Sequence, residues 1–349
     1  MIITTKIINF HNKYVYTPKY IVNDYKKSCC DVIRNIHIQI SENDIVGLGE
    51  IALGQHSEYE PEQIEHIINH FFQKEIADNA SPENVLQLMK NCNIPSPVQA
   101  GIDMALWDLY GKKCCKPCHT IYGLPKRKIF TAITVATNDF DILRNQITDL
   151  LYATQAKYLK IKLGYPDGIE RDKELFLAAF EIAKCFKAKL RVDANGGWKV
   201  EQAIEMLRWL KNFNIDYVEQ PIPHGEEEEL KHIFPSRGVP IFLDESCKNS
   251  YDVASFANRC DGIVLNLMKC GGVTETIRIV ATARAHNLKV ALGCRSESTI
   301  GISAALSIAS LFDFVDLDSH LYILNDPFAN KLKLDKGRLS MTDGYGYGL

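Results

Sequence analysis

The chain lacks the sequence features of membrane proteins and of nucleic-acid-binding proteins. No stretch reaches the roughly 18 consecutive apolar residues that a membrane span needs, and the start, MIITTKIINF, lacks the basic region and cleavage site of a signal peptide. The formal net charge is only -3 over 349 residues, and no block of arginine and lysine occurs. We therefore expect a cytoplasmic location, and we expect neither nucleic acid nor an anionic membrane as a partner.

Two common cofactor motifs are also missing. The glycine-rich pieces VGLGE and GLGEIALG contain no GxGxxG between a strand and a helix, which does not favour a dinucleotide-binding loop. Cys115 and Cys118 form a CxxC beside His119, but no second pair with this spacing follows, so structural zinc is not favoured. The 11 cysteines are scattered through a long chain without an export signal, and we expect reduced, mostly buried thiols.

A repeating pattern begins near residue 130. Short apolar runs alternate with amphipathic helical stretches in units of roughly 25 to 30 residues, which predicts βα units and a parallel sheet. Eight such units most naturally close into an α/β barrel of the (β/α)8 type, with the last helix shortened, because the chain after Asp318 has the composition of loop and turns. The expected strands span 130–137, 158–164, 189–194, 216–221, 240–246, 262–268, 289–294 and 314–318.

Residues 1–115 have a different pattern, typical of a separate α+β capping domain. Three strand-like runs form a meander, two helices are expected near 61–76 and 81–92, and SPVQAGIDMALWDLYGKK predicts a further helix. We expect the barrel to span 116–321, and the tail 322–349 to pack back on the capping domain.

The second barrel strand, YLKIKLG, carries two lysines on one face. Side chains at positions i and i+2 of a strand point the same way, so Lys160 and Lys162 lie side by side, while Leu159, Ile161 and Leu163 cover the other face. Two ammonium groups this close repel each other. Either this face is a solvated edge, or it is a site that uses the repulsion.

Three successive strands end in an acid: Asp193 in RVDAN, Glu219 in YVEQP and Asp244 in FLDES. One βα repeat separates each from the next, so neighbouring strands would hold all three at the functional, C-terminal mouth of the barrel. Converging carboxylates need a cation between them, and oxygen ligands suit magnesium. The alternative is that each acid caps the following helix.

Together these motifs resemble the muconate lactonizing enzyme subgroup of the enolase superfamily along nearly all of the chain. The resemblance rests on a capping domain, KxK on the second barrel strand, and D, E and D on the third, fourth and fifth. It implies that Lys162 is the general base that removes the proton α to a carboxylate, that Lys160 assists it, and that Mg2+ stabilises the resulting enolate. A neighbouring ammonium and a divalent cation would lower the pKa of Lys162 and make it usable as a base.

The eighth strand, VDLDSH, bears on the substrate. Asp316 and Asp318 share a face, and a DxD here resembles the dipeptide epimerases of the L-Ala-D/L-Glu type, in which the acid pair holds the α-ammonium of the substrate. The alternative is that both aspartates are solvated or pair with a loop lysine. The resemblance also implies that Thr134 and Cys294 touch the substrate, and that Asn195 lies in the outer surroundings of the metal.

The sixth strand departs from that pattern. Dipeptide epimerases usually read IKLMKCGG, and the first lysine is the second base, whereas this chain reads VLNLMKCGG. Asn266 therefore occupies the second-base position at the substrate, and an amide cannot take up a proton at neutral pH. Lys269 is an alternative proton donor. Arg295 stands where a small or apolar residue is usual, and we expect the loops at 14–28 and after Arg295 to set specificity.

Three functions remain open on these observations. The first is a magnesium-dependent, dipeptide epimerase-like enzyme whose epimerisation is impaired by Asn266. The second is a one-base cycloisomerase, or an enzyme of the o-succinylbenzoate synthase kind, in which Lys162 alone suffices. The third is a non-catalytic descendant that binds a dipeptide. In each case the partner is a small molecule, and the family's tendency to assemble suggests a homo-oligomer.

Overall fold

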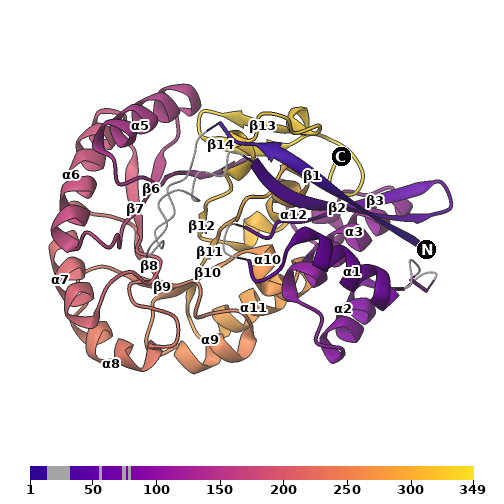
Figure 1. Ribbon diagram of the computed structural model, residues 1–349, viewed down its shortest axis with the longest axis horizontal. Helices are drawn as coiled ribbons and strands as arrows, with labels where there is room; N and C mark the ends of the chain where they lie inside the picture. Colours follow the sequence, from indigo (N-terminus) through magenta and orange to yellow (C-terminus); the bar gives the residue numbers. More distant parts are fainter. Residues whose placement is uncertain (14–31, 55–56, 73–75, 78–79) are drawn as a thin grey trace.

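The computed structural model describes residues 1–13, 32–54, 57–72, 76–77 and 80–349. It shows an N-terminal domain beside a barrel whose helices lie on the outside (Figure 1). The predicted fold class is confirmed. The predicted specificity loop at 14–28 lies outside the described residues.

The N-terminal domain is an antiparallel meander packed on helices. On the central strand Ile36, Ile38 and Ile40 alternate toward the helices and are fully buried, which is the period-2 pattern of a one-sided sheet. Gly47 on the third strand has to be glycine, because an added Cβ would lie 2.1 Å from the Ala105 carbonyl oxygen. The elements are β1 (Ile2–His11), β2 (Val32–Glu42), β3 (Ile45–Ile51), α1 (Pro61–Phe72), α2 (Pro82–Asn91) and α3 (Ser96–Lys113).

Eight parallel strands form the barrel in sequence order, and each predicted strand has a counterpart. The first prediction, 130–137, covers two strands, because Ile129 and Phe130 pair with the C-terminal tail and only the following residues join the barrel. The strands are β5 (Ala132–Val135), β6 (Tyr158–Lys162), β7 (Lys189–Asp193), β8 (Val218–Glu219), β9 (Ile241–Leu243), β10 (Gly262–Leu265), β11 (Lys289–Leu292) and β12 (Phe314–Val315).

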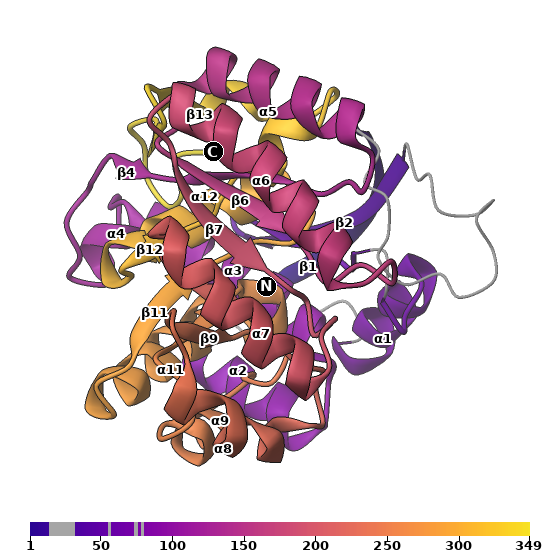
Figure 2. The ribbon, with the colours of Figure 1, turned by 90° about the vertical axis from the view of Figure 1, so that its left-hand side faces the viewer.

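Helices cover the outside of these strands, as seen from the barrel side in Figure 2. The eighth unit has only a short 3-10 turn, Ser319–Tyr322, in place of a helix, which confirms the expected shortening. The helices are α4 (Cys118–Ile121), α5 (Phe140–Thr154), α6 (Ile169–Cys185), α7 (Val200–Leu210), α8 (Leu230–Ile233), α9 (Ser250–Phe256), α10 (Leu267–Cys270), α11 (Val273–Ala285) and α12 (Thr299–Ile308).

Side chains join the two ends of the strand order. The Leu317 amide donates to Thr131 Oγ1 at 2.7 Å, and the Thr134 amide donates to Asp318 Oδ2 at 2.6 Å. The bottom of the barrel is filled by aromatic rings, with Tyr217 stacked on Phe242 at 4.3 Å between ring centroids. These rings fill the lower part of the barrel interior, so a ligand would bind toward the mouth.

The C-terminal tail touches both parts of the molecule. Its strand β13 (Leu332–Asp335) pairs with β14 (Arg338–Met341), and β14 pairs with β4 (Ile129–Phe130). The Leu324 amide donates to the His11 carbonyl, and the Tyr347 amide donates to Asp108 Oδ1 in α3, each at 2.8 Å.

The described part of the chain contains no helix with the length and apolar character needed to span a bilayer. Of the nine cysteines in that part of the chain, four are buried, four are exposed and one is half-buried, so the expectation of mostly buried thiols is wrong.

Candidate active site at the barrel mouth

Strand pairing brings the predicted acids and lysines together. Lys162 lies opposite Asp193 in the pairing of β6 with β7, and Asp193 lies opposite Glu219 in the pairing of β7 with β8. Asp244 follows directly after β9. Neighbouring parallel strands thus place these side chains at the C-terminal end of the barrel.

Lys162 lies between two partners from the β7 end. Its Nζ is 3.1 Å from Asp193 Oδ2 and donates to Asn195 Oδ1 at 3.0 Å, while about a third of its side chain, 30%, stays exposed. Burial, the largest single effect, and repulsion from Lys160 disfavour the ammonium, but attraction to Asp193 and Glu219 and the hydrogen bond to Asp193 together outweigh them, so the pKa of Lys162 is raised. The carboxylates alone therefore do not produce the lowered pKa expected from the sequence.

Lys160 is fully inside the barrel. Its Nζ donates to Glu219 Oε2 at 3.0 Å and lies 3.2 Å from Asp316 Oδ2. Burial lowers its pKa, yet attraction to Glu219 and Asp316 raises it well above the ordinary value, so the group stays charged. The alternative of a solvated lysine pair is wrong for Lys160, whose side chain is only 9% exposed.

The three predicted metal ligands are each paired with a lysine. Asp193 contacts Lys162, Glu219 contacts Lys160, and Asp244 forms an ion pair with Lys269. Among the residues that the structure describes, no three His, Cys, Asp or Glu side chains are gathered closely enough to hold a metal ion as they stand.

The chemistry of this carboxylate group nonetheless suits a cation. Burial and then repulsion from Asp193 and Asp244 raise the pKa of Glu219 well above its ordinary value. The next residue after Asp244, Glu245, has a buried Oε2 without a hydrogen-bond partner, and burial together with Asp244 and Asp193 raises its pKa to about 7. Crowded, buried carboxylate oxygens are the ligands that Mg2+ prefers. The donor set therefore fits the predicted ion.

Asn266 is turned toward its own backbone. Its Oδ1 accepts from the Lys269 amide at 2.8 Å, so the side chain caps the short helix α10. Only 6% of the residue is exposed. Neutral and engaged in this cap, Asn266 has no group that could act as a base.

Lys269 is occupied as well. Its Nζ donates to the backbone oxygens of Asp244 at 2.6 Å and Val264 at 2.8 Å, and to the Asp244 carboxylate. These three acceptors match the three donors of an ammonium. The alternative second base is therefore committed to the ends of β9 and β10.

The two aspartates of the eighth strand differ in depth. Asp316 lies in the barrel interior, where it accepts from Arg191 Nη1 and from Tyr217 OH and contacts Lys160. Burial raises the pKa of Asp316, but attraction to Lys160 and Arg191 lowers it by more, so the pKa lies below its ordinary value. This arrangement does not favour the predicted contact between Asp316 and a substrate.

Asp318 lies at the mouth with the other predicted substrate contacts. Its Oδ2 accepts from the Thr134 amide and from Tyr322 OH at 2.9 Å, and its Oδ1 is 3.8 Å from Cys294 Sγ. Burial raises its pKa. The structure thus brings Thr134, Cys294 and Asp318 together, and one oxygen of Asp318 faces the half-buried thiol.

The family model described as "Enolase C-terminal domain-like" matches residues 143–349. The chain belongs to this family. The matched residues contain most of the barrel, including most of the strand ends that form its mouth.

Two curated relatives and one solved structure are similar along most of the chain. A hydrophobic dipeptide epimerase of Roseobacter litoralis is 42% identical over 90% of both chains, and an L-Ala-D/L-Glu epimerase of Bacteroides thetaiotaomicron is 30% identical over 90% of this chain and 80% of its own. A dipeptide epimerase from Enterococcus faecalis V583, complexed with Mg and L-Leu-L-Tyr, has a TM-score of 0.88 and 26% identity, covering 99% and 98% of the two chains. The predicted enzyme class, an isomerase of the enolase superfamily, is confirmed.

Several site residues were missed from the sequence. Arg191 lies two positions before Asp193 on β7, and this i, i+2 spacing places both side chains inside the barrel. Its guanidinium lies 4.6 Å from the Tyr158 ring centroid and also pairs with Asp216. An arginine within an apolar strand is ordinarily exposed, which hides this signal. Gln220, Glu245 and Tyr217 adjoin the predicted acids and gave no pattern of their own.

Proposed function

We propose that the chain is a magnesium-dependent enzyme of the dipeptide epimerase kind, in which Lys162 removes the proton α to the substrate carboxylate. The observation that carries this proposal is the position of Lys162 Nζ, partly exposed at the barrel mouth between Asp193 and Asn195. The dipeptide is proposed from the similarity to epimerases that act on hydrophobic dipeptides or L-Ala-D/L-Glu.

Asp193, Glu219 and Asp244 would hold Mg2+, which when bound would offset the charge of these carboxylates and of the substrate carboxylate. A bound cation would also offset the carboxylates that raise the pKa of Lys162 and so favour its neutral amine. In the proton abstraction the C–H electron pair moves into the substrate carboxylate, and the neutral amine of Lys162 takes the proton at Nζ. Lys160, held by Glu219 and Asp316, keeps a fixed positive charge beside the base. Asp318 would accept a hydrogen bond from the substrate α-ammonium through Oδ1, since its Oδ2 is held by Thr134 and Tyr322.

The cap made by Asn266 supports a one-base reaction. With Asn266 bonded to the Lys269 amide, and Lys269 bonded to Asp244 and Val264, neither side chain is placed as a second base. Lys162 would therefore remove and return the proton on one face of the substrate. The same observation favours a second candidate, a one-base cycloisomerase or an enzyme of the o-succinylbenzoate synthase kind.

A dipeptide panel in deuterium oxide with Mg2+ tests the proposal. Uptake of deuterium at the α-carbon is followed by proton NMR, and inversion by chiral chromatography. Lys162→Ala should lower uptake at least about 100-fold, whereas Lys184→Ala, at an exposed position on α6, should leave it unchanged. Binding without any uptake would support a non-catalytic dipeptide-binding protein, and neither binding nor uptake would favour the cycloisomerase reading.

A further inference from the structure

A buried carboxylate outside the predicted site holds the two loops that carry the base and its partners. Asp172, in the first turn of α6, has no exposed surface. Its Oδ2 accepts from the Gly164 amide at 2.8 Å and from Trp198 Nε1 at 2.7 Å, and its Oδ1 accepts from the Tyr165 amide at 3.3 Å. A carboxylate this deeply buried is costly unless such donors surround it.

These donors come from neighbouring loops. Gly164 and Tyr165 follow β6, the strand that carries Lys160 and Lys162, and Trp198 follows β7, which ends at Asp193. One side chain from α6 therefore connects the loop after the base to the loop after a proposed metal ligand.

The two loops also touch backbone to backbone. A Cβ added to Gly164, whose φ is +80°, would lie 2.4 Å from the Ala194 carbonyl oxygen, and one added to Gly197 would lie 2.2 Å from the Gly164 oxygen. The Leu163 amide donates to the Asp193 carbonyl at 2.8 Å in the same region. Contact this close leaves no room for one loop to move unless the other moves with it.

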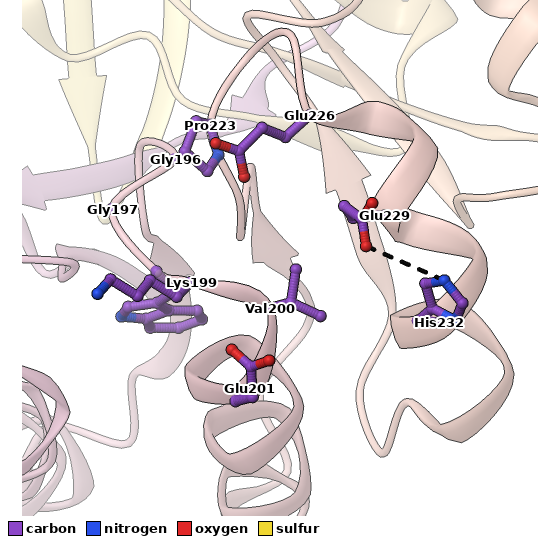
Figure 3. A pocket seen from close by; sticks show the side chains of 10 residues that line it. Gly196, Gly197, Lys199, Val200, Glu201, Pro223, Glu226, Glu229 and His232 are labelled. Atoms are coloured by element: carbon purple, nitrogen blue, oxygen red, sulfur yellow. Dashed lines mark ion pairs between the residues drawn. The ribbon is translucent and has the colours of Figure 1, made fainter.

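On its other side the second loop lines a cavity that it shares with the segment after β8. Gly196 to Glu201 line a cavity of about 500 Å3 together with Pro223, Glu229 and His232 from the segment that follows β8 (Figure 3). Asp172 is not part of the cavity wall. The segment after β8 also holds this loop, because the Gly196 amide donates to the Gln220 carbonyl at 2.7 Å and the Trp198 amide donates to the Pro221 carbonyl at 3.2 Å. Asp172 adds the side-chain link between this loop and the loop after β6.

We infer that Asp172 is a positioning residue, which fixes the distances from Lys162 Nζ to Asp193 and Asn195 by clamping the loops after β6 and β7. Those distances are 3.1 Å and 3.0 Å, and Lys162 lies only two residues before Gly164. A misplacement of about 1 Å at a reacting group is enough to cost roughly 100-fold in rate. This inference rests on the proposed proton abstraction by Lys162.

The test compares three variants of the full chain with Mg2+ and the dipeptide that the wild type exchanges best. Asp172→Asn keeps the size of the side chain but turns an NH2 group toward N–H donors. Trp198→Phe removes the hydrogen bond from the indole N–H to Asp172 and keeps a smaller aromatic ring. Asp103→Asn is the matched control, because Asp103 is equally buried and accepts from Thr274, away from these loops. The kcat and KM of deuterium uptake and the melting temperature are measured for each.

We expect Asp172→Asn to lower kcat about 10- to 100-fold with KM changed less than about threefold, and Trp198→Phe to lower kcat by a smaller factor. Asp103→Asn should keep the wild-type kcat, even if its melting temperature falls as much as that of Asp172→Asn. An unchanged kcat in folded Asp172→Asn would overturn the inference. Should that variant not fold, an unchanged kcat in Trp198→Phe would do the same. An equal loss of kcat in Asp103→Asn would also overturn it. A wild type without uptake on any dipeptide would instead overturn the proposed function, and this role with it.

Discussion

At the scale of single residues, depth in the barrel separates the two aspartates of VDLDSH. Asp316 faces Arg191, Tyr217 and Lys160 in the closed interior, where it balances two buried cations. Asp318 faces the mouth and bonds to Thr134 and Tyr322 across the seam of the barrel. Both side chains are buried, but only Asp318 lies near the groups proposed to meet a substrate.

The two positions should therefore respond differently to the same change. Asp318→Asn should weaken the binding of a dipeptide with a free α-ammonium by about 1.5 to 3 kcal/mol, because it removes a hydrogen bond to a charged group. Asp316→Asn should lower the free energy of unfolding by about 3 kcal/mol, because it breaks two buried ion pairs and leaves Lys160 with Glu219 and Arg191 with Asp216 as the remaining partners. Calorimetric titration and urea unfolding measure these effects, and the reverse pattern would contradict the assignment.

At the scale of elements, one contact between the capping domain and the barrel is a buried carboxylate at a helix start. Glu50 on β3 is fully buried and accepts from the Ser298 amide, the Ser298 hydroxyl and the Gly301 amide at 2.9 to 3.0 Å. These donors lie at the N-terminus of α12, where a negative charge is favourable. The loop just before them, from Cys294 to Glu297, lies at the mouth.

Glu50→Gln should lower the free energy of unfolding by about 1.5 to 3 kcal/mol, since hydrogen bonds to a charged acceptor are replaced by bonds to a neutral amide. Urea unfolding measures the change. Glu62→Gln is the control, because Glu62 pairs with Arg34 at an exposed surface, and we expect no measurable change there. Equal stability of the two variants would show that the α12 contact does not hold the domains together.

The elements were predicted well where burial alone specifies them, and less well where tertiary partners decide. Parallel strands are buried on both faces, so their apolar runs were visible in the sequence. The polar residues at the strand ends, such as Lys162, Asp193 and Glu219, then indicated which side chains lie at the same height in the barrel. Depth along a strand is invisible to a period of two, so Asp316 and Asp318 were predicted to have the same role. Asn266 was predicted to occupy the second-base position at the substrate, but its cap on α10 depends on local backbone geometry that the sequence pattern does not display.

At the scale of the whole molecule, a buried histidine links stability to pH. Burial lowers the pKa of His320 to about 4, although Asp326 opposes the shift. Its ordinary value is about 6.5. Between these pH values the unfolded chain binds a proton that the folded chain does not, so the free energy of unfolding rises with pH over this window and this contribution is constant above it.

We expect the wild type to lose about 3 kcal/mol relative to His320→Gln when the pH falls from 7 to 4, as the two pKa values require. Urea unfolding of both proteins across this range isolates the contribution, because other titrating groups are common to both. Parallel stability curves would show that His320 has the same pKa in the folded and the unfolded chain.

Metal binding should also act on the whole molecule. If Mg2+ binds only the folded chain, a concentration 100 times its Kd raises the free energy of unfolding by about 2.7 kcal/mol. The melting temperature of the wild type should rise with Mg2+ and fall with a chelator. The melting temperatures of Asp193→Asn and Asp244→Asn should change with neither. A magnesium response that survives in these variants would place the ion elsewhere.

The central claim, that Lys162 is the only base at this site, is tested most directly by following both epimers of one dipeptide in deuterium oxide. The epimer whose α-hydrogen faces Lys162 should exchange it much faster than the centre inverts, while the opposite epimer should hardly exchange. Asn266→Lys should add a donor on the far face and raise inversion, even though loss of the cap costs about 1 kcal/mol of stability. Inversion of both epimers by the wild type at the rate of exchange would contradict the claim, because a second proton donor would then be at work.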